Sequence, residues 1–109
     1  MKIEFTMLHG EAGEWITDFI RDQLMEMYAR DKSLIAARIN LKEVADEGPA
    51  SRVCEIELTA FGEKMFVHRA AESFGNAVRS VLAELRILVD EKVRQGQELP
   101  DVIMSTVKA

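Results

Sequence analysis

Apolar and polar residues alternate over residues 2–8, with the period of two that is typical of a strand with one buried face. A break with two glycines follows at residues 9–13. From residue 14 to residue 29 the apolar residues instead recur every three or four positions, which predicts an amphipathic helix. Its apolar stripe consists of Trp15, Ile16, Phe19, Ile20, Leu24, Met27 and Tyr28. The chain is therefore expected to begin with a strand, followed by a helix whose apolar stripe is wide enough to cover a sheet.

Residues 35–42 carry the clearest alternation in the sequence and predict a second strand. Its two sides are Ile35, Ala37, Ile39 and Leu41, and Ala36, Arg38, Asn40 and Lys42. Residues 43–51 are polar and rich in turn formers, which predicts a loop. A third strand follows, with Cys54, Ile56, Leu58 and Ala60 on one side. A short turn at residues 61–63 leads to a fourth strand at residues 64–70, so these two strands are expected to form a hairpin.

Ser73 is a good helix cap, and the apolar residues after it recur in steps of three and four, which predicts a second amphipathic helix. Its stripe consists of Phe74, Ala77, Val78, Val81, Leu82, Leu85, Leu88, Val89 and Val93. Gly96 is expected to end this helix, because glycine tolerates the left-handed conformation at a helix C-terminus. The sequence thus predicts one domain at residues 1–96 and a tail at residues 97–109. The tail is expected to add a strand, to pair with a partner or to remain mobile.

These elements follow one another in the order β-α-β-β-β-α, which predicts an α+β fold. Its core is expected to be a four-stranded, mainly antiparallel sheet with both helices packed on one face. The other face of the sheet is left open to water. The cross-strand charge pairs expected on this open face join Arg38 and Lys42 to Glu55 and Glu57.

The composition is that of one globular domain, with 109 residues, of which 48% are hydrophobic and 30% charged. The formal net charge of -5 argues against a surface that attracts polyanions as a whole, so contact with nucleic acid would need a local basic strip.

A lone cysteine, Cys54, cannot form an internal disulfide, which favours a reducing cytoplasm. The sequence has neither a signal-peptide pattern at its start nor a run of about 18 apolar residues, so neither secretion nor membrane spanning is expected.

The residue types that metal binding and catalysis require are few and scattered. His9, His68 and Cys54 lie in different segments with no paired spacing, so no metal site is expected. The six glycines form no phosphate-binding loop, so no nucleotide cofactor is expected. No serine stands in a recognisable pattern with a histidine and an acid. The chain is therefore expected to be a binding protein without a cofactor rather than an enzyme.

Four stretches of the sequence carry a resemblance to a known family. They are Met1-Lys2-Ile3-Glu4-Phe5, Trp15-Ile16-Thr17-Asp18-Phe19-Ile20, Ile35-Ala36-Ala37-Arg38-Ile39-Asn40-Leu41-Lys42, and Ala71-Glu72-Ser73-Phe74-Gly75-Asn76-Ala77-Val78 followed by Leu85. In their order and spacing they resemble the ribosome hibernation promoting factors, also called ribosome-associated inhibitors or sigma-54 modulation proteins. The resemblance implies a fold related to double-stranded RNA-binding domains. It also implies binding to the small ribosomal subunit in the decoding region, which blocks translation when growth stops.

The chain departs from the family pattern mainly in its charges. Gln23, Glu26 and Glu84 stand where family members carry lysines, Arg79 replaces a usual aspartate, and Gly75 replaces a usual tyrosine. Basic side chains of the family contact phosphates of ribosomal RNA. The candidates for such contacts in this chain are Arg79, Arg86, Lys92 and Arg94 on the second helix and Arg38 and Lys42 on the sheet.

Other interpretations of the same residues stay open. The helix arginines also fit a solvated face with intrahelical pairs such as Arg86 to Asp90. The whole chain also fits an interaction module without RNA binding, such as a homodimer formed through the open sheet, Phe66 or the tail. Phe66 itself suits either stacking of a base or covering of a sheet edge or a partner subunit. An enzyme on this scaffold would need a pocket with converging polar groups, and the sequence indicates none.

Overall fold

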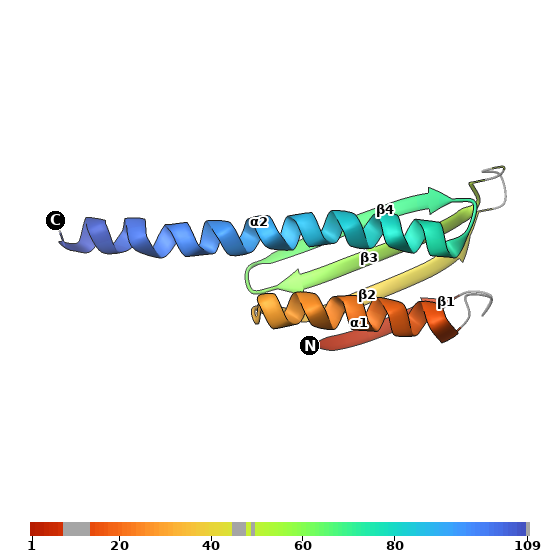
Figure 1. The fold of residues 1–109 in the computed structure, drawn as a ribbon, viewed down its shortest axis with the longest axis horizontal. Coiled ribbons are helices and arrows are strands. Elements are labelled where there is room, and N and C mark those ends of the chain that lie inside the picture. Colours follow the sequence, from red (N-terminus) through yellow and green to blue (C-terminus); the bar gives the residue numbers. More distant parts are fainter. Residues whose placement is uncertain (8–13, 45–47, 49, 109) are drawn as a thin grey trace.

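The computed structural model describes residues 1–7, 14–44, 48 and 50–108 of the chain, and side chains within residues 1–6, 15–44, 48 and 50–95. Its elements are β1 (Lys2–Met7), α1 (Glu14–Arg30), β2 (Leu34–Glu43), β3 (Arg52–Ala60), β4 (Glu63–Ala71) and α2 (Phe74–Lys108). The predicted order β-α-β-β-β-α and the α+β class are confirmed. Both helices lie on the same face of the sheet and run side by side in the same direction (Figure 1).

The sheet has the strand order β1-β2-β3-β4 and is mixed. β1 pairs with β2 in parallel, whereas β3 is antiparallel to both β2 and β4. Parallel neighbours need a crossover connection, and α1 supplies it, which places this helix on one face of the sheet. The turn between β3 and β4 contains Gly62 at a φ of 81°, a left-handed conformation that glycine adopts without strain. The predicted hairpin is therefore confirmed.

A β-bulge at the start of β2 changes which residues face the helices. Leu34 pairs with Ala60, and the next paired residue is Ala36, opposite Thr59, so Ile35 is skipped. A bulge inserts one extra residue into a strand and shifts the alternation of its side chains. Leu34 is consequently buried and Ile35 is 43% exposed. The prediction that Ile35 shares a side with Ala37 and Ile39 is wrong for this reason.

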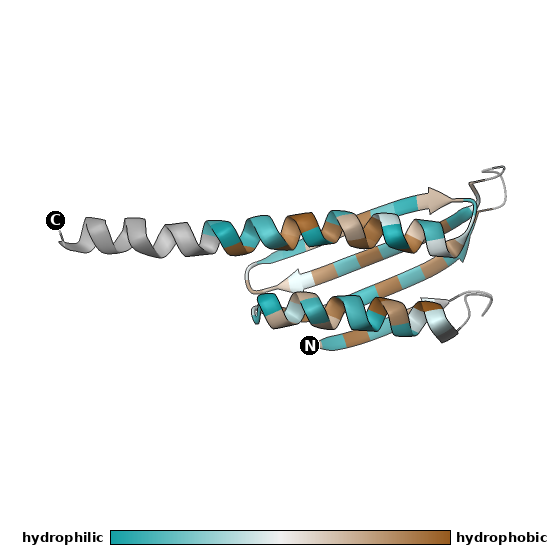
Figure 2. Cartoon of the chain, in the orientation of Figure 1, coloured by the Kyte–Doolittle hydropathy of each residue, from teal (hydrophilic) through white to brown (hydrophobic). Residues whose placement is uncertain are grey.

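The hydrophobic core lies between the helices and the covered face of the sheet. Both helices carry brown and teal residues in turn in Figure 2, and their buried apolar residues belong to the same core as those of the sheet. The largest fully buried side chains are Ile20, Leu24 and Met27 of α1, Ile39, Leu41, Ile56 and Leu58 of the sheet, and Val78, Val81, Leu85 and Val89 of α2. Each contributes about 1.5 to 3 kcal/mol by leaving water. Periodicity thus identified most of the core correctly.

The helix α2 begins as predicted and ends later than predicted. The hydroxyl oxygen of Ser73 accepts a hydrogen bond from the amide of Asn76 at 3.2 Å, which confirms the cap. The helix then continues through Gly96 to Lys108, so the prediction that Gly96 ends it is wrong. A single interior glycine costs a helix only about 1 kcal/mol, and its neighbours here are arginine, glutamine, glutamate and leucine, which favour helix. The division into a domain at 1–96 and a tail at 97–109 stays a prediction.

The open face of the sheet carries ion pairs and one exposed aromatic pair. Lys42 contacts Glu55 at 3.2 Å, as predicted. Arg38 lies opposite Glu57, but its ion pair is with Glu4 of the neighbouring strand β1, at 3.9 Å. Phe66 is 55% exposed on the edge strand β4, and its ring centroid lies 5.6 Å from that of His68. Over the residues that the structure describes, neither helix combines the length and apolar character of a membrane span.

Candidate nucleic-acid interface

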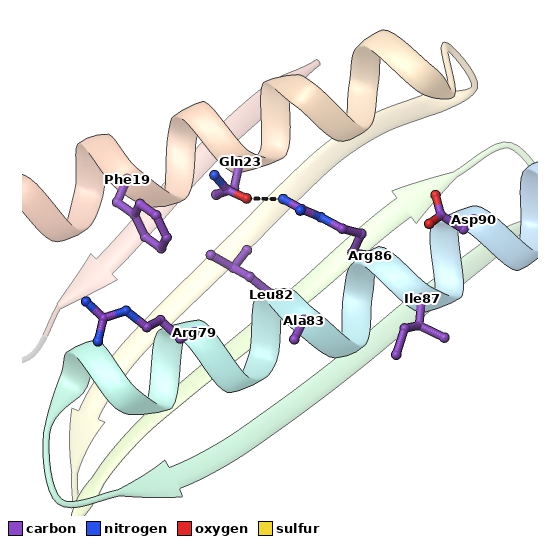
Figure 3. A pocket seen from close by; sticks show the side chains of 8 residues that line it. All are labelled: Phe19, Gln23, Arg79, Leu82, Ala83, Arg86, Ile87 and Asp90. Atoms are coloured by element: carbon purple, nitrogen blue, oxygen red, sulfur yellow. Dashed lines mark hydrogen bonds between the residues drawn. The ribbon is translucent and has the colours of Figure 1, made fainter.

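A groove runs along the seam between α1 and α2, on the side of the helix layer that faces away from the sheet. Two adjoining hollows of about 340 and 320 Å³ lie along it, and Arg86 and Asp90 line both. Figure 3 shows the first hollow, with Phe19 and Gln23 on α1 facing Arg79 and Arg86 on α2. Its lining is Phe19, Gln23, Arg79, Leu82, Ala83, Arg86, Ile87 and Asp90. The groove therefore combines an apolar floor with arginines on its α2 side.

Arg86 is held across the groove by side chains of α1. Its guanidinium donates a hydrogen bond to the side-chain carbonyl of Gln23 and lies 3.5 Å from the carboxylate of Glu26. The predicted intrahelical pair with Asp90 is wrong, because Asp90 instead contacts Arg30 of α1 at 2.7 Å. The two helices run side by side in the same direction, so charged side chains of α2 find partners on α1. An arginine four residues before an acid is also the weaker orientation for an intrahelical pair.

Arg79 and Arg94 are exposed arginines of α2 that lie on either side of Arg86 along the helix. With Arg86 they are spaced by seven and eight residues, which puts all three within one face of a helix. Neither Arg79 nor Arg94 forms an ion pair or hydrogen bond with any other side chain in the described part of the chain. These two guanidinium groups are therefore available for an anion, whereas Arg86 must first leave Gln23 and Glu26.

Lys92 serves a structural contact. Its ammonium donates to the carboxylate of Asp31 at 2.9 Å and to the hydroxyl of Ser33 at 2.6 Å, and its side chain is only 22% exposed. Burial alone would raise the pKa of Asp31, but hydrogen bonds from Ser33 and Lys92 outweigh it and hold that pKa below its ordinary value. Lys92 thereby ties α2 to the turn between α1 and β2.

Arg38 and Lys42 lie on the open face of the sheet, opposite the helices. Their strand neighbour Ile39 is buried under the helix layer, and side chains alternate between the two faces of a strand. The six candidate basic residues therefore do not form a single surface. The structure brings Arg79, Arg86 and Arg94 together along α2 and leaves the two sheet residues on the far side.

Trp15 lies against the start of α2 rather than in the core. Its side chain is 53% exposed, so its predicted place in the buried stripe of α1 is wrong. The indole lies over Gly75 at the start of α2, where an added Cβ would come within 3.2 Å of the Trp15 ring. Phe19, one turn further along α1, has its ring centroid 6.4 Å from that of Trp15. No local pattern reveals this contact, because it joins two residues that are distant in sequence.

Comparison with known proteins yields matches among solved structures alone. No protein-family model and no curated protein sequence matches the chain. The N-terminal domain of Protein Y from Thermus thermophilus matches with a TM-score of 0.69 and 16% identity, over 84% of this chain and 98% of that domain. A ribosomal subunit interface protein from Coxiella burnetii matches with a TM-score of 0.70 and 9% identity, over 84% of this chain and 97% of that one. The chain therefore shares the fold of these two proteins.

The remaining candidate residues, a cysteine and two histidines, give no sign of a reactive or metal-binding site among the described residues. Cys54 is fully buried, and burial raises the pKa of its thiol to about 12, so the thiol stays protonated near neutral pH. Among the described residues, no three histidine, cysteine or acidic side chains converge on a point where a metal ion fits. His9 lies outside the described residues. The groove between the helices is accordingly the feature from which we argue function.

Proposed function

We propose that this chain is a cytoplasmic, ribosome-associated protein that binds the small ribosomal subunit and limits translation under stress or in stationary phase. The observation that carries the proposal is the fold match over 84% of the chain to Protein Y and to a ribosomal subunit interface protein. The role proposed is one of binding rather than catalysis. Sequence identities of 16% and 9% leave the contacts to be argued from this chain's own residues.

The α2 side of the groove is the surface that we assign to ribosomal RNA. Arg79 and Arg94 are exposed and have no side-chain partner among the described residues, and Arg86 lies between them along α2. Guanidinium groups pair well with phosphate oxygens, and release of counterions gives such contacts much of their affinity. The chain is acidic overall, and α1 itself carries four carboxylates against two arginines. Binding is therefore expected to be weak, local and strongly dependent on salt.

Sedimentation of the protein with ribosomes tests this proposal. Extracts of stationary-phase cells, or purified ribosomes mixed with the protein, are separated on sucrose gradients at low salt. The protein is expected in fractions that contain small subunits and to leave them as salt is raised. A protein that stays at the top of the gradient at low salt, with none in ribosomal fractions, contradicts the proposal.

Replacing Glu26 by lysine is expected to strengthen ribosome binding. The change removes the carboxylate that lies 3.5 Å from Arg86 and adds a cation at the same place. The groove would gain one or two phosphate contacts, so affinity at low salt should rise on the order of tenfold. The slope of log affinity against log salt should steepen by about 1 to 2. Quantitative co-sedimentation across a salt series measures both quantities.

The matched control for Glu26→Lys is Glu63→Lys, which makes the same change of charge at an exposed position at the start of β4. A local effect raises affinity for Glu26→Lys alone. Equal gains from both variants would mean that net charge, rather than the groove, governs binding.

A second candidate function is self-association through the open sheet. Phe66 is 55% exposed on the edge strand β4, and Phe61 in the adjoining turn is 75% exposed. Unpaired strand edges and exposed aromatic residues are common at protein interfaces. A solution mass of twice 12.3 kDa that falls to the monomer mass in Phe66→Ser would favour this function. A monomer at high concentration would eliminate it.

A further inference from the structure

Trp15 is an exposed aromatic side chain that does not pack into the core. Trp15 is 53% exposed, although it lies in the first two turns of a helix whose opposite face is buried. One edge of its ring rests on Gly75, and any side chain at position 75 would press against it, because a Cβ there comes within 3.2 Å. The lack of a side chain at Gly75 thus creates the place where the indole lies.

Phe19 and Arg79 form the next step along the same groove. Each lies four residues after its neighbour, Phe19 after Trp15 on α1 and Arg79 after Gly75 on α2, which is one helical turn. Phe19 and Arg79 line one hollow, and Figure 3 shows them on opposite sides of it. On this part of α1, the carboxylate of Asp18 contacts Arg21 at 3.3 Å. The exposed ring of Trp15 is therefore followed by the apolar hollow beside Phe19, and the guanidinium of Arg79, which has no side-chain partner among the described residues, lies on the other side of that hollow.

This sequence of groups matches the chemistry of an unpaired nucleotide. Bases of single-stranded RNA stack on aromatic side chains, and arginine pairs with the adjoining phosphate. The other exposed aromatic pair, Phe66 and His68, lies directly opposite Glu57 and Glu55, which disfavour a phosphate. Of these two aromatic surfaces, only the one formed by Trp15 and Phe19 adjoins an arginine that has no side-chain partner among the described residues, because Arg79 lines the same hollow as Phe19.

We propose that Trp15, Phe19 and Arg79 hold one unpaired nucleotide of RNA, with the base against the aromatic rings and its phosphate at the Arg79 guanidinium. This inference rests on the proposed function, and it adds the kind of RNA element that the groove recognises. The RNA at this end of the groove is a single-stranded or flipped-out residue rather than a regular duplex. Base stacking of this kind tolerates any of the four bases.

Fluorescence of the protein reports on this site directly, because Trp15 is the only tryptophan in the chain. The full-length protein is titrated with a short single-stranded RNA, a uridine or adenine hexamer, and with an abasic oligomer of the same length. Saturable quenching by the RNA and not by the abasic oligomer is expected. Arg79→Gln should weaken RNA binding several-fold while the final degree of quenching stays the same. Quenching that is equal for both oligomers overturns the proposal.

Variants and ribosome sedimentation separate this inference from the proposed function. Trp15→Leu and Trp15→Phe lack the only tryptophan, so their binding is measured with a dye-labelled RNA. Trp15→Leu should bind roughly 5- to 100-fold more weakly than wild type, and Trp15→Phe should bind more tightly than Trp15→Leu. Gly75→Ala keeps the tryptophan but crowds it, so it should also weaken binding even where Trp15→Leu fails to fold. Phe66→Leu, on the opposite face, is the control and should bind normally.

If wild-type protein sediments with ribosomes but Trp15→Leu and Gly75→Ala do so equally well, the nucleotide site is wrong and the proposed function stands. If wild-type protein neither sediments with ribosomes nor changes its fluorescence with RNA, both are wrong. A fluorescence response to isolated ribosomal proteins but not to RNA likewise overturns the nucleotide site, because it assigns Trp15 to a protein partner.

Discussion

Replacing Arg79, Arg86 and Arg94 together by glutamine is expected to lower the affinity of the protein for small ribosomal subunits on the order of 100-fold at low salt. The three guanidinium groups share one face of α2, and Arg79 and Arg94 have no competing side-chain partner among the described residues. Loss of three phosphate contacts should also reduce the slope of log affinity against log salt by about 2 to 3. Co-sedimentation over a range of salt concentrations measures both effects.

A triple variant on the sheet provides the matched control. Arg38, Lys42 and Lys64 are replaced by glutamine, so the change in net charge is the same. These side chains contact Glu4, Glu55 and Glu57 on the open face, and their loss should leave the affinity within a fewfold of wild type. A control variant that loses affinity as strongly as the helix variant would assign RNA binding to the sheet.

Replacing Lys92 by methionine is expected to reduce the free energy of unfolding by about 1 to 3 kcal/mol at pH 7 and to leave ribosome binding unchanged. Methionine keeps the apolar stem of the side chain but removes the ammonium that donates to Asp31. The Asp31 residue is only 8% exposed, so its carboxylate would lose its cation without gaining much water. Denaturation with urea measures the loss, and Arg94→Met, two residues away and exposed, should cost less than about 0.5 kcal/mol.

The effect of Lys92→Met should depend on pH in a defined direction. The pKa of Asp31 in the folded protein lies below its ordinary value of 3.8. A lowered folded-state pKa adds stability above the unfolded-state pKa, and this stability is lost as the pH falls through the folded-state value. The difference between wild type and Lys92→Met should therefore be constant near neutral pH and shrink below about pH 4. A difference that persists unchanged in acid would mean that packing, not the ion pair, is the cause.

Most of the fold follows from periodicity in the sequence. The alternation in the strands and the three-and-four spacing in the helices identify the elements, their order and nearly the whole core, because burial of apolar side chains is what selects both patterns. The failures are local. A bulge moved Ile35 to the surface, and a glycine that fits a helix terminus proved to be an interior residue of α2. Neither a bulge nor the choice between two tolerated places for glycine is encoded by period alone.

The candidate site was less accessible from the sequence, since its features depend on which side chains meet between α1 and α2. In the sequence, Asp90 four residues later is the expected partner of Arg86. In the folded chain α1 lies alongside α2, and Arg86 contacts Gln23 and Glu26 of α1 instead. The same approach joins Lys92 to Asp31, which removes a predicted RNA contact from the surface that we propose. Trp15 and Gly75 are 60 positions apart, so their contact exists only in the folded chain. Lys42 was predictable because strand register fixes its neighbours.

Site-specific photo-crosslinking tests most directly whether the groove between α1 and α2 is the face that binds the small subunit. A photoreactive phenylalanine derivative is placed at position 83, where Ala83 is exposed and lines the groove, and in a second variant at position 66 on the open sheet. Crosslinks from position 83 to RNA of the small subunit, with none from position 66, are the predicted result. Crosslinks from position 66 without any from position 83, or an absence of small-subunit RNA from both, would contradict it.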